Sequence, residues 1–240
     1  MALEPWGDIW WDDPEWASPV PFVDGLADAD RATDLGTAFH RLAQFAVVSR
    51  DSSGVLHMPP QDRIEALAHS CSLGPEARMR LRDALERWFA SDIAVRMGAC
   101  ADLRAEVPFI VCLDGGMLHR GAARLADDAQ QKSDLYLEGE IDLLALSEDG
   151  LHAQVVDYKT GGSSVETAAE LARKHVLQAS CYAYALLRDG VRSVDAAFVR
   201  VEQNDPLDPG QPQIVRYRFC VDDLAVLEQA IGSVAMAACV

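Results

Sequence analysis

The sequence predicts an α/β domain with a central mixed β-sheet flanked by helices. Two observations lead to this fold class: the order of apolar patterns along the chain, and a hairpin signal near its middle. The patterns run as helices, three strands, a long helix, two strands and a closing helix. A chain of 240 residues that is 50% hydrophobic and 25% charged is long enough for one domain with a buried core.

Helical patterns dominate the first part of the chain. Apolar residues recur at spacings of three and four in three stretches: residues 33–49, 61–71 and 75–97. In the first stretch, Leu35, Phe39 and Leu42 form the apolar stripe. The third stretch begins with Pro75, whose missing N–H is tolerated in a first turn. We therefore expect three helices before the first strand, the third of them continuous to Met97.

Strands and two further helices follow. Short apolar or alternating stretches predict strands at residues 103–113, in both halves of 136–161, at 195–201 and at 213–219. A long helix is expected at about residues 165–188, capped by Ser163 or Ser164, and a closing helix from about Asp222. Residues 114–132, which contain three glycines, are expected to form a loop near the hairpin.

The hairpin at residues 136–161 is the strongest local signal, because positions 149 and 150 are Asp-Gly, a preferred turn. If these two residues form the loop, Asp142 lies directly opposite Asp157 with Cβ atoms about 5 Å apart. A four-residue loop would place the two carboxylates on a diagonal of one face, and a three-residue loop would separate them. Lys159 lies two residues beyond Asp157 and therefore shares its face.

Two carboxylates and an ammonium on one face suggest a metal site. Like charges placed opposite each other oppose folding, so a cation normally neutralises them. A hard divalent metal suits oxygen ligands best. Such a metal beside a lysine can support the hydrolysis of a phosphodiester. The alternative for so short a pattern is an ordinary hairpin with surface charges.

Five short segments follow one another along the chain: LGTAFH (35–40), EVPF (106–109), GEIDLL (139–144), VVDYKTG (155–161) and QASCY (178–182). In this order they resemble the motifs of the PD-(D/E)XK nucleases. The resemblance is greatest to the RecB-like branch, the nuclease domains at the C-termini of the helicase-nucleases RecB and AddA. It implies a restriction-endonuclease-like core and DNA hydrolysis that depends on Mg²⁺ or Mn²⁺, with exonuclease action as the expected mode.

The resemblance also implies a role for each matching residue. His40, Asp142, Asp157 and the backbone carbonyl of Tyr158 would hold the metal. Lys159 would stabilise the nucleophile or the charge that develops during its attack.

Three further residues are assigned to the catalytic site by the same resemblance. Gln178 and Tyr182, spaced by one helical turn, would position Lys159 or the DNA. Glu106 would orient a water or a neighbouring ligand, although a simple surface glutamate is an alternative.

Basic residues near these motifs are candidates for phosphate contacts. Arg173 and Lys174 come one turn before Gln178 and are the predicted nucleic-acid-binding residues, with His175 beside them. A second basic group lies in the third predicted helix, where a solvated face and a phosphate track are both open: Arg78, Arg80, Arg82 and Arg87.

The net charge of −17 restricts the partners. Phosphate binding relies on basic surfaces, so this chain should hold DNA weakly by itself. We expect a helicase motor to deliver unwound or single-stranded DNA. Because no G-x-x-x-x-G-K-[ST] loop occurs, the chain would be an excised or separately encoded nuclease domain. Two alternatives stay open: a non-catalytic module that docks a partner or senses DNA ends, and a stand-alone DNA or RNA nuclease.

The acidic charge is concentrated at the N-terminus. Residues 1–32 are rich in Trp and Pro and are expected to form an extension or linker, which folds back on the domain or docks a partner. Residues 33–240 are expected to form a single nuclease domain.

Cysteine and apolar patterns exclude several other classes. The six cysteines are scattered without a C-x-x-C pair, so we expect neither zinc nor an iron–sulfur cluster. No apolar run of about 18 residues occurs, and the N-terminus lacks the basic residues of a signal peptide. We therefore expect no membrane association and a cytoplasmic location.

Overall fold

The computed structural model describes residues 34–113, 135–162 and 166–238, and all structural statements refer to them. The strands are β1 (Asp102–Leu113), β2 (Leu135–Leu146), β3 (His152–Lys159), β4 (Ser193–Asn204) and β5 (Pro212–Cys220). The helices are α1 (Asp34–Val48), α2 (Gln61–Ser70), α3 (Pro75–Phe89), α4 (Asp92–Ala99), α6 (Ala168–Arg188) and α7 (Leu224–Ala238), the last preceded by the short 3₁₀ helix η2 (Val221–Asp223).

The five strands form one mixed sheet in the order β1-β2-β3-β4-β5. Neighbouring strands are antiparallel except β3 and β4, which are parallel. A parallel pair needs a crossover, and α6 provides it between β3 and β4. The predicted fold class, an α/β domain with a central mixed sheet and a restriction-endonuclease-like core, is confirmed.

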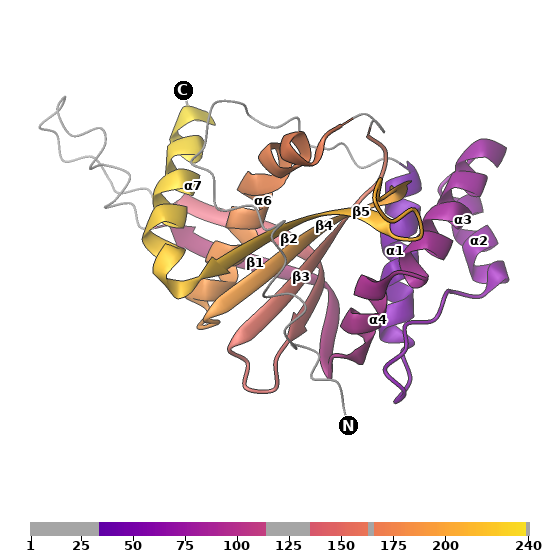
Figure 1. The fold of residues 1–240 in the computed structure, drawn as a ribbon, viewed down its shortest axis with the longest axis horizontal. Coiled ribbons are helices and arrows are strands. Elements are labelled where there is room, and N and C mark those ends of the chain that lie inside the picture. Colours follow the sequence, from indigo (N-terminus) through magenta and orange to yellow (C-terminus); the bar gives the residue numbers. More distant parts are fainter. Residues whose placement is uncertain (1–33, 114–134, 163–165, 239–240) are drawn as a thin grey trace, which may run out of the picture.

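Helices cover both faces of the sheet, as Figure 1 shows. Helices α1 to α4 enclose one core, in which Phe39, Leu85 and Trp88 are buried. Helices α6 and α7 enclose the other, which contains Tyr184 and Tyr217. The sheet thus separates two apolar layers, and polar side chains of α1 and α6 can meet only where the strands diverge.

Strands β1 and β2 change the face they present midway along their length. Ala105 packs against the core of α1 to α4, but Val107, two residues later, packs against the core of α6 and α7. Glu106 between them has a φ of 51°, which a residue with a side chain rarely adopts. The facing strand makes the same change on either side of Asp142. Both acidic residues therefore lie at a matched irregularity of the sheet.

The β2–β3 hairpin has the register that places Asp142 opposite Asp157, because Leu143 pairs with Val156. Of the loop lengths that the sequence left open, the two-residue turn is not formed, although its register is. The loop spans four residues, 148–151, between Ser147 and His152, whose backbones are hydrogen bonded. The Asp149 carboxylate accepts hydrogen bonds from the Ser147 hydroxyl and the Leu151 amide, so side-chain bonding replaces the innermost backbone pair.

Two helix boundaries also differ from expectation. The stretch 75–97 forms two helices, because the Ser91 hydroxyl accepts a hydrogen bond from the Ala94 amide and caps α4. Helix α6 is capped by Thr167 in a capping box with Glu170, whereas Ser163 and Ser164 lie outside the described residues.

The predicted extension at residues 1–32 and the predicted loop at residues 114–132 also lie outside the described residues. None of the described helices is both long and apolar enough to span a membrane.

Gly139 of β2 leaves room for the ring of Phe109 of β1, and this ring contacts Tyr182 of α6. The two residues pair across β1 and β2, and the Phe109 ring lies over the glycine. This position brings the ring edge-to-face with Tyr182 of α6, with centroids 5.9 Å apart. A side chain at position 139 would occupy the space of the ring.

Substitution of Gly139 by alanine should therefore destabilise the fold. Its Cβ would lie 2.7 Å from Phe109 Cζ, so the ring must move away from Tyr182. We expect a loss of about 1–3 kcal/mol in the free energy of unfolding, measured by chemical denaturation. The cost should shrink in a Phe109→Leu background, because the smaller side chain leaves room. Equal costs in both backgrounds would contradict this explanation.

Candidate active site

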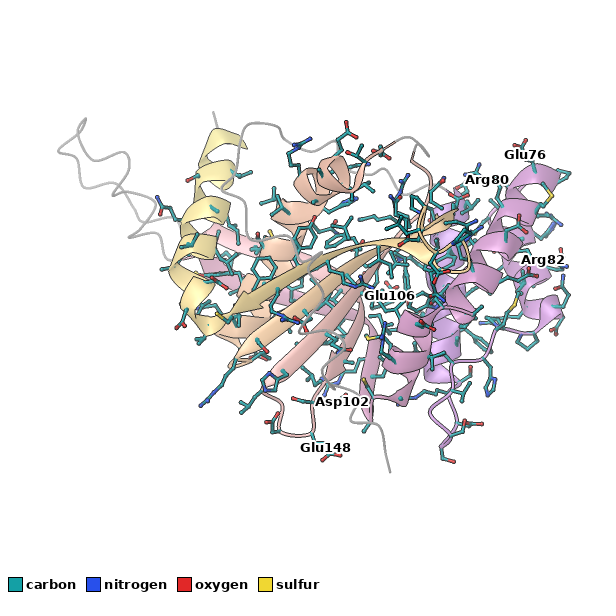
Figure 2. The ribbon with its side chains drawn as sticks, in the orientation of Figure 1. Glu76, Arg80, Arg82, Asp102, Glu106 and Glu148 are labelled. Carbon is teal, nitrogen blue, oxygen red and sulfur yellow. The ribbon has the colours of Figure 1, made fainter. Side chains whose placement is uncertain are left out.

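A pocket of about 790 Å³ opens where β2 and β3 diverge between α1 and α6. Its polar lining comes from α1, the β1–β2 irregularity, the end of β3 and α6: Thr37, His40, Arg41, Gln44, Glu106, Glu140, Asp142, Asp157, Lys159, Thr160, Gln178 and Tyr182. Glu106 is labelled in Figure 2, between the strands and the layer of α1 to α4. Every residue that the sequence analysis assigned to catalysis or metal binding lines this pocket.

One cluster in the pocket contains His40, Glu106 and Asp142. His40 Nδ1 lies 3.4 Å from Asp142 Oδ1 and 3.7 Å from Glu106 Oε1. One potential ligand atom from each of the three residues lies within 4.8 Å of the others. Helix α1 supplies the imidazole because Phe39, the preceding residue, is fully buried against Tyr158 and fixes the helix on the sheet.

The Asp142 carboxylate also takes the place of a backbone acceptor that β2 does not offer to β3 at this point. The β2–β3 ladder ends at Leu143 and Val156, and the Tyr158 amide instead donates a hydrogen bond of 2.7 Å to Asp142 Oδ2. In a strand, the N–H and C=O of one residue point to the same side. The Tyr158 carbonyl therefore faces the same gap, beside the Asp142 carboxylate.

In this cluster, the positive charge of a protonated His40 partly offsets the negative charges of the two carboxylates. Burial alone would lower the pKa of the His40 imidazole, but the carboxylates of Asp142 and Glu106 outweigh burial and raise that pKa to about 10. Burial, followed by the charge of Asp142, raises the pKa of Asp157, and Lys159 counteracts part of this rise. Without a metal, the protonated imidazole partly neutralises the carboxylates around it.

A second cluster surrounds Lys159. Its ammonium lies 2.8 Å from Asp157 Oδ1 and donates to Gln178 Oε1 at 2.9 Å. Gln178 Nε2 donates to Asp157 Oδ2 at 2.8 Å, and the Tyr182 hydroxyl donates to the same oxygen at 2.7 Å. The one-turn spacing of Gln178 and Tyr182 on α6 thus lets both side chains reach Asp157. Together they fix the lysine and the carboxylate relative to each other.

A hydrogen bond to a side chain of β4 fixes the turn after Lys159. The Gly161 amide donates to the Glu202 carboxylate, which forms a two-pronged ion pair with Arg80 of α3 at 2.8 and 3.1 Å. Gly161 has a φ of 77°, a conformation that glycine adopts without strain. Strand β4 and helix α3 therefore anchor the end of the strand that carries Lys159.

The residues present fit a divalent metal. Asp157 Oδ1 is buried and accepts no well-aligned hydrogen bond, although it forms the ion pair with Lys159. A buried carboxylate oxygen in this state can take a cation as its partner. The other donors are two carboxylates, one imidazole and a carbonyl, a set that suits Mg²⁺ or Mn²⁺. Glu106, which was expected to orient a water or a ligand, lies in the cluster with His40 and Asp142. Asp157, which was expected to bind the metal, belongs to the cluster around Lys159.

The predicted phosphate contacts lie elsewhere. Arg173 is exposed and Lys174 is partly buried, and neither lines the pocket. His175 cannot contact a phosphate as expected, because it is 5% exposed and stacks on Phe198 in the core. The helical period turns it inward, in line with Leu171 and Ala179.

The arginines of α3 are held by the protein itself. Arg80 binds Glu202, Arg87 donates to Asn204 and to the Val201 carbonyl, and Arg78 donates to the Leu73 carbonyl. The structure therefore favours the solvated, internally paired face over a phosphate track.

Five polar residues of the pocket were not predicted from the sequence: Thr37, Arg41, Gln44, Glu140 and Thr160. Gln44 could have been found, since it lies one helical turn after His40. Glu140 could also have been found, because it shares strand parity with Asp142. The position of Arg41 depends on the rotation of α1 over the sheet and has no comparable signal.

A mixed sheet that joins acidic residues and a lysine between two helices defines a restriction-endonuclease-like domain. The family model of the PD-(D/E)XK nuclease superfamily matches residues 22–238, so the chain belongs to that superfamily. No curated protein matches the sequence.

Removal of one carboxylate should strongly weaken metal binding. Mn²⁺ should raise the melting temperature of the native protein, because a ligand that binds only the folded state adds about 2.7 kcal/mol at 100 times its Kd. Asp142→Asn should lose most of this gain. Glu148→Gln is the matched control, since it removes the same charge at the tip of the hairpin, far from Glu106 in Figure 2. A full Mn²⁺ response in Asp142→Asn would rule out this site.

The backbone at Glu106 should contribute measurable strain. Glycine tolerates a φ of 51°, so Glu106→Gly should be about 1 kcal/mol more stable than Glu106→Gln without metal. Both substitutions remove the same charge and should weaken Mn²⁺ binding equally. Chemical denaturation measures the stabilities, and a glycine variant less stable than the glutamine variant would show that the conformation is unstrained.

Proposed function

We propose that this protein hydrolyses DNA phosphodiester bonds with Mg²⁺ or Mn²⁺. Membership of the nuclease superfamily supports the reaction class. The observation that carries the proposal is the position of Lys159, which is held by Asp157 and Gln178 beside the His40, Glu106 and Asp142 cluster. An ammonium fixed beside an acidic metal-binding cluster can support phosphodiester hydrolysis.

Four groups would hold the metal: the His40 imidazole, the carboxylates of Asp142 and Asp157, and the Tyr158 carbonyl, with Glu106 as a further ligand. A divalent cation held there would polarise the phosphate and neutralise the charge that develops on it. Because the pKa of His40 is raised in the metal-free site, its imidazole must lose a proton before it can act as a ligand.

Lys159 would act directly on the reacting groups. Its side chain is 16% exposed, so the ammonium is accessible from the pocket yet largely shielded from water. There it can stabilise an attacking oxygen or the negative charge of the transition state. Gln178 accepts from this ammonium, and burial raises the pKa of the Tyr182 hydroxyl, which remains a donor to Asp157. These two side chains would keep Lys159 and Asp157 in place.

The finer proposal is an exonuclease of the RecB-like branch that works with a helicase motor in the same or another chain. The five motif segments support this branch, and the net charge of −17 supports a need for delivered DNA. A motor that unwinds a duplex would present single strands to the pocket between α1 and α6. The alternative is a docking or DNA-end-sensing module that keeps the fold without catalysis.

Replacement of Lys159 by alanine should lower kcat by a factor of about 10²–10³, because a preorganised charge at the reaction centre is lost. The assay follows end-labelled linear single- and double-stranded DNA with Mn²⁺. Mn²⁺-dependent thermal stabilisation should persist in this variant. Asp157→Ala should lose both activity and stabilisation, and Arg192→Ala, an exposed position before β4, is the control for loss of one cation.

A closed single-stranded circle in the same assay distinguishes the two modes of cleavage. An exonuclease leaves the circle intact, whereas an endonuclease opens it. Equal cleavage by the native protein and Lys159→Ala would refute the assigned site. Metal binding without cleavage of any substrate would favour dependence on a motor, and absence of both would favour the docking module.

A further inference from the structure

Helix α1 presents a continuous polar stripe to the pocket beside its buried one. Thr37, His40, Arg41 and Gln44 all line the pocket and follow one another at helical spacings. They cover two turns, or about 10 Å along the helix axis. Only His40 belongs to the acidic cluster. The rest of the stripe therefore has a position at the pocket wall but no part in the chemistry assigned above.

Arg41 differs from Arg50 and Arg80 in its partners. Its side chain is exposed, and within the described residues no hydrogen bond or ion pair engages its guanidinium. By contrast, Arg50 donates to the carbonyls of Gly98 and Cys100, and Arg80 binds Glu202. A guanidinium at the wall of an acidic pocket, with no partner in the part of the chain that the structure describes, is available for an anion from outside.

The charges around the pocket make such a cation necessary for a polyanionic substrate. Glu106, Glu140, Asp142 and Asp157 all line the pocket and would repel phosphates on either side of the reacting one. Lys159 already pairs with Asp157 inside the pocket. A phosphate outside the acidic cluster therefore needs another positive group.

The pocket wall is also asymmetric in charge. On the β2 side, Glu140 is exposed and repels phosphates. On the α1 side, Arg41 can bind a phosphate through two parallel N–H donors. Gln44, three residues further along the helix, adds a neutral donor for a phosphate or sugar oxygen. The chain thus favours passage of a nucleic-acid strand along α1.

We propose that Arg41, assisted by Gln44, forms a subsite for the phosphate adjacent to the scissile one, so that the strand lies along α1. This inference rests on the proposed nuclease function. It places the phosphate contact on the opposite side of the pocket from α6, where Arg173 and Lys174 were expected to provide it.

The test compares three arginine variants that each remove one positive charge: Arg41→Ala, Arg173→Ala and Arg192→Ala. Binding of a short fluorescein-labelled single-stranded oligodeoxynucleotide is measured by anisotropy with Ca²⁺ at several salt concentrations. Arg41→Ala should bind about tenfold more weakly, and its slope of log affinity against log salt should fall by about 0.7, the value for one phosphate on a single strand. Arg41→Lys should restore the slope, and Arg192→Ala should match the native protein.

The outcomes separate this inference from the proposed function. An affinity of Arg41→Ala equal to that of Arg192→Ala overturns the inference, as does a loss confined to Arg173→Ala, which would place the strand along α6. With Mn²⁺, the effect of Arg41→Ala on cleavage should fall mainly on KM. Arg41-dependent binding with neither Mn²⁺ binding nor cleavage would refute the nuclease function and keep the subsite. Cleavage by the native protein, with binding and KM unchanged in Arg41→Ala, would keep the nuclease function and refute the subsite.

Discussion

The structure depends on holding three carboxylates close together in a partly dry pocket. Glu106, Asp142 and Asp157 repel one another, and burial strengthens that repulsion because water no longer screens it. The chain offsets the repulsion locally. The Tyr158 amide donates to Asp142, the His40 imidazole takes up a proton between Asp142 and Glu106, and Lys159 pairs with Asp157. A divalent cation would replace the proton of His40 as the neutralising charge.

The surrounding fold provides the support that such a site needs. The irregularity of β1 and β2 turns Glu106 and Asp142 into one gap at the cost of an unfavourable backbone conformation. Rigid elements hold the other groups: α1 is fixed by Phe39 in one core, and α6 presents Gln178 and Tyr182 from the other. The site thus lies where the two cores of the domain meet, so its geometry is coupled to the packing of both layers.

Much of the fold could be predicted from the sequence because its signals are local. Apolar spacing identified most helices and strands, and strand parity gave the face shared by Asp157 and Lys159. The predicted helix boundaries and the hairpin loop differed from the structure where a side chain determines the backbone conformation. Ser91 divides the predicted helix at 75–97, Thr167 starts α6, and Asp149 widens the hairpin loop. In each case a short polar side chain takes a backbone hydrogen bond that periodicity cannot reveal.

The sequence by itself determined which chemical groups the domain contains: the acids, the lysine and the histidine in five ordered motifs. It left three registers of the hairpin open, and the structure selected the one that sets Asp142 against Asp157. Only the tertiary structure decided how these groups divide into two clusters. It joined Glu106 to His40 and Asp142, assigned Asp157 to Lys159, turned His175 into the core and brought Arg41 to the pocket wall. The physical reason is that motifs report spacing along one element, whereas these contacts depend on the rotation of α1 and α6 over the sheet and on the change of face at Glu106.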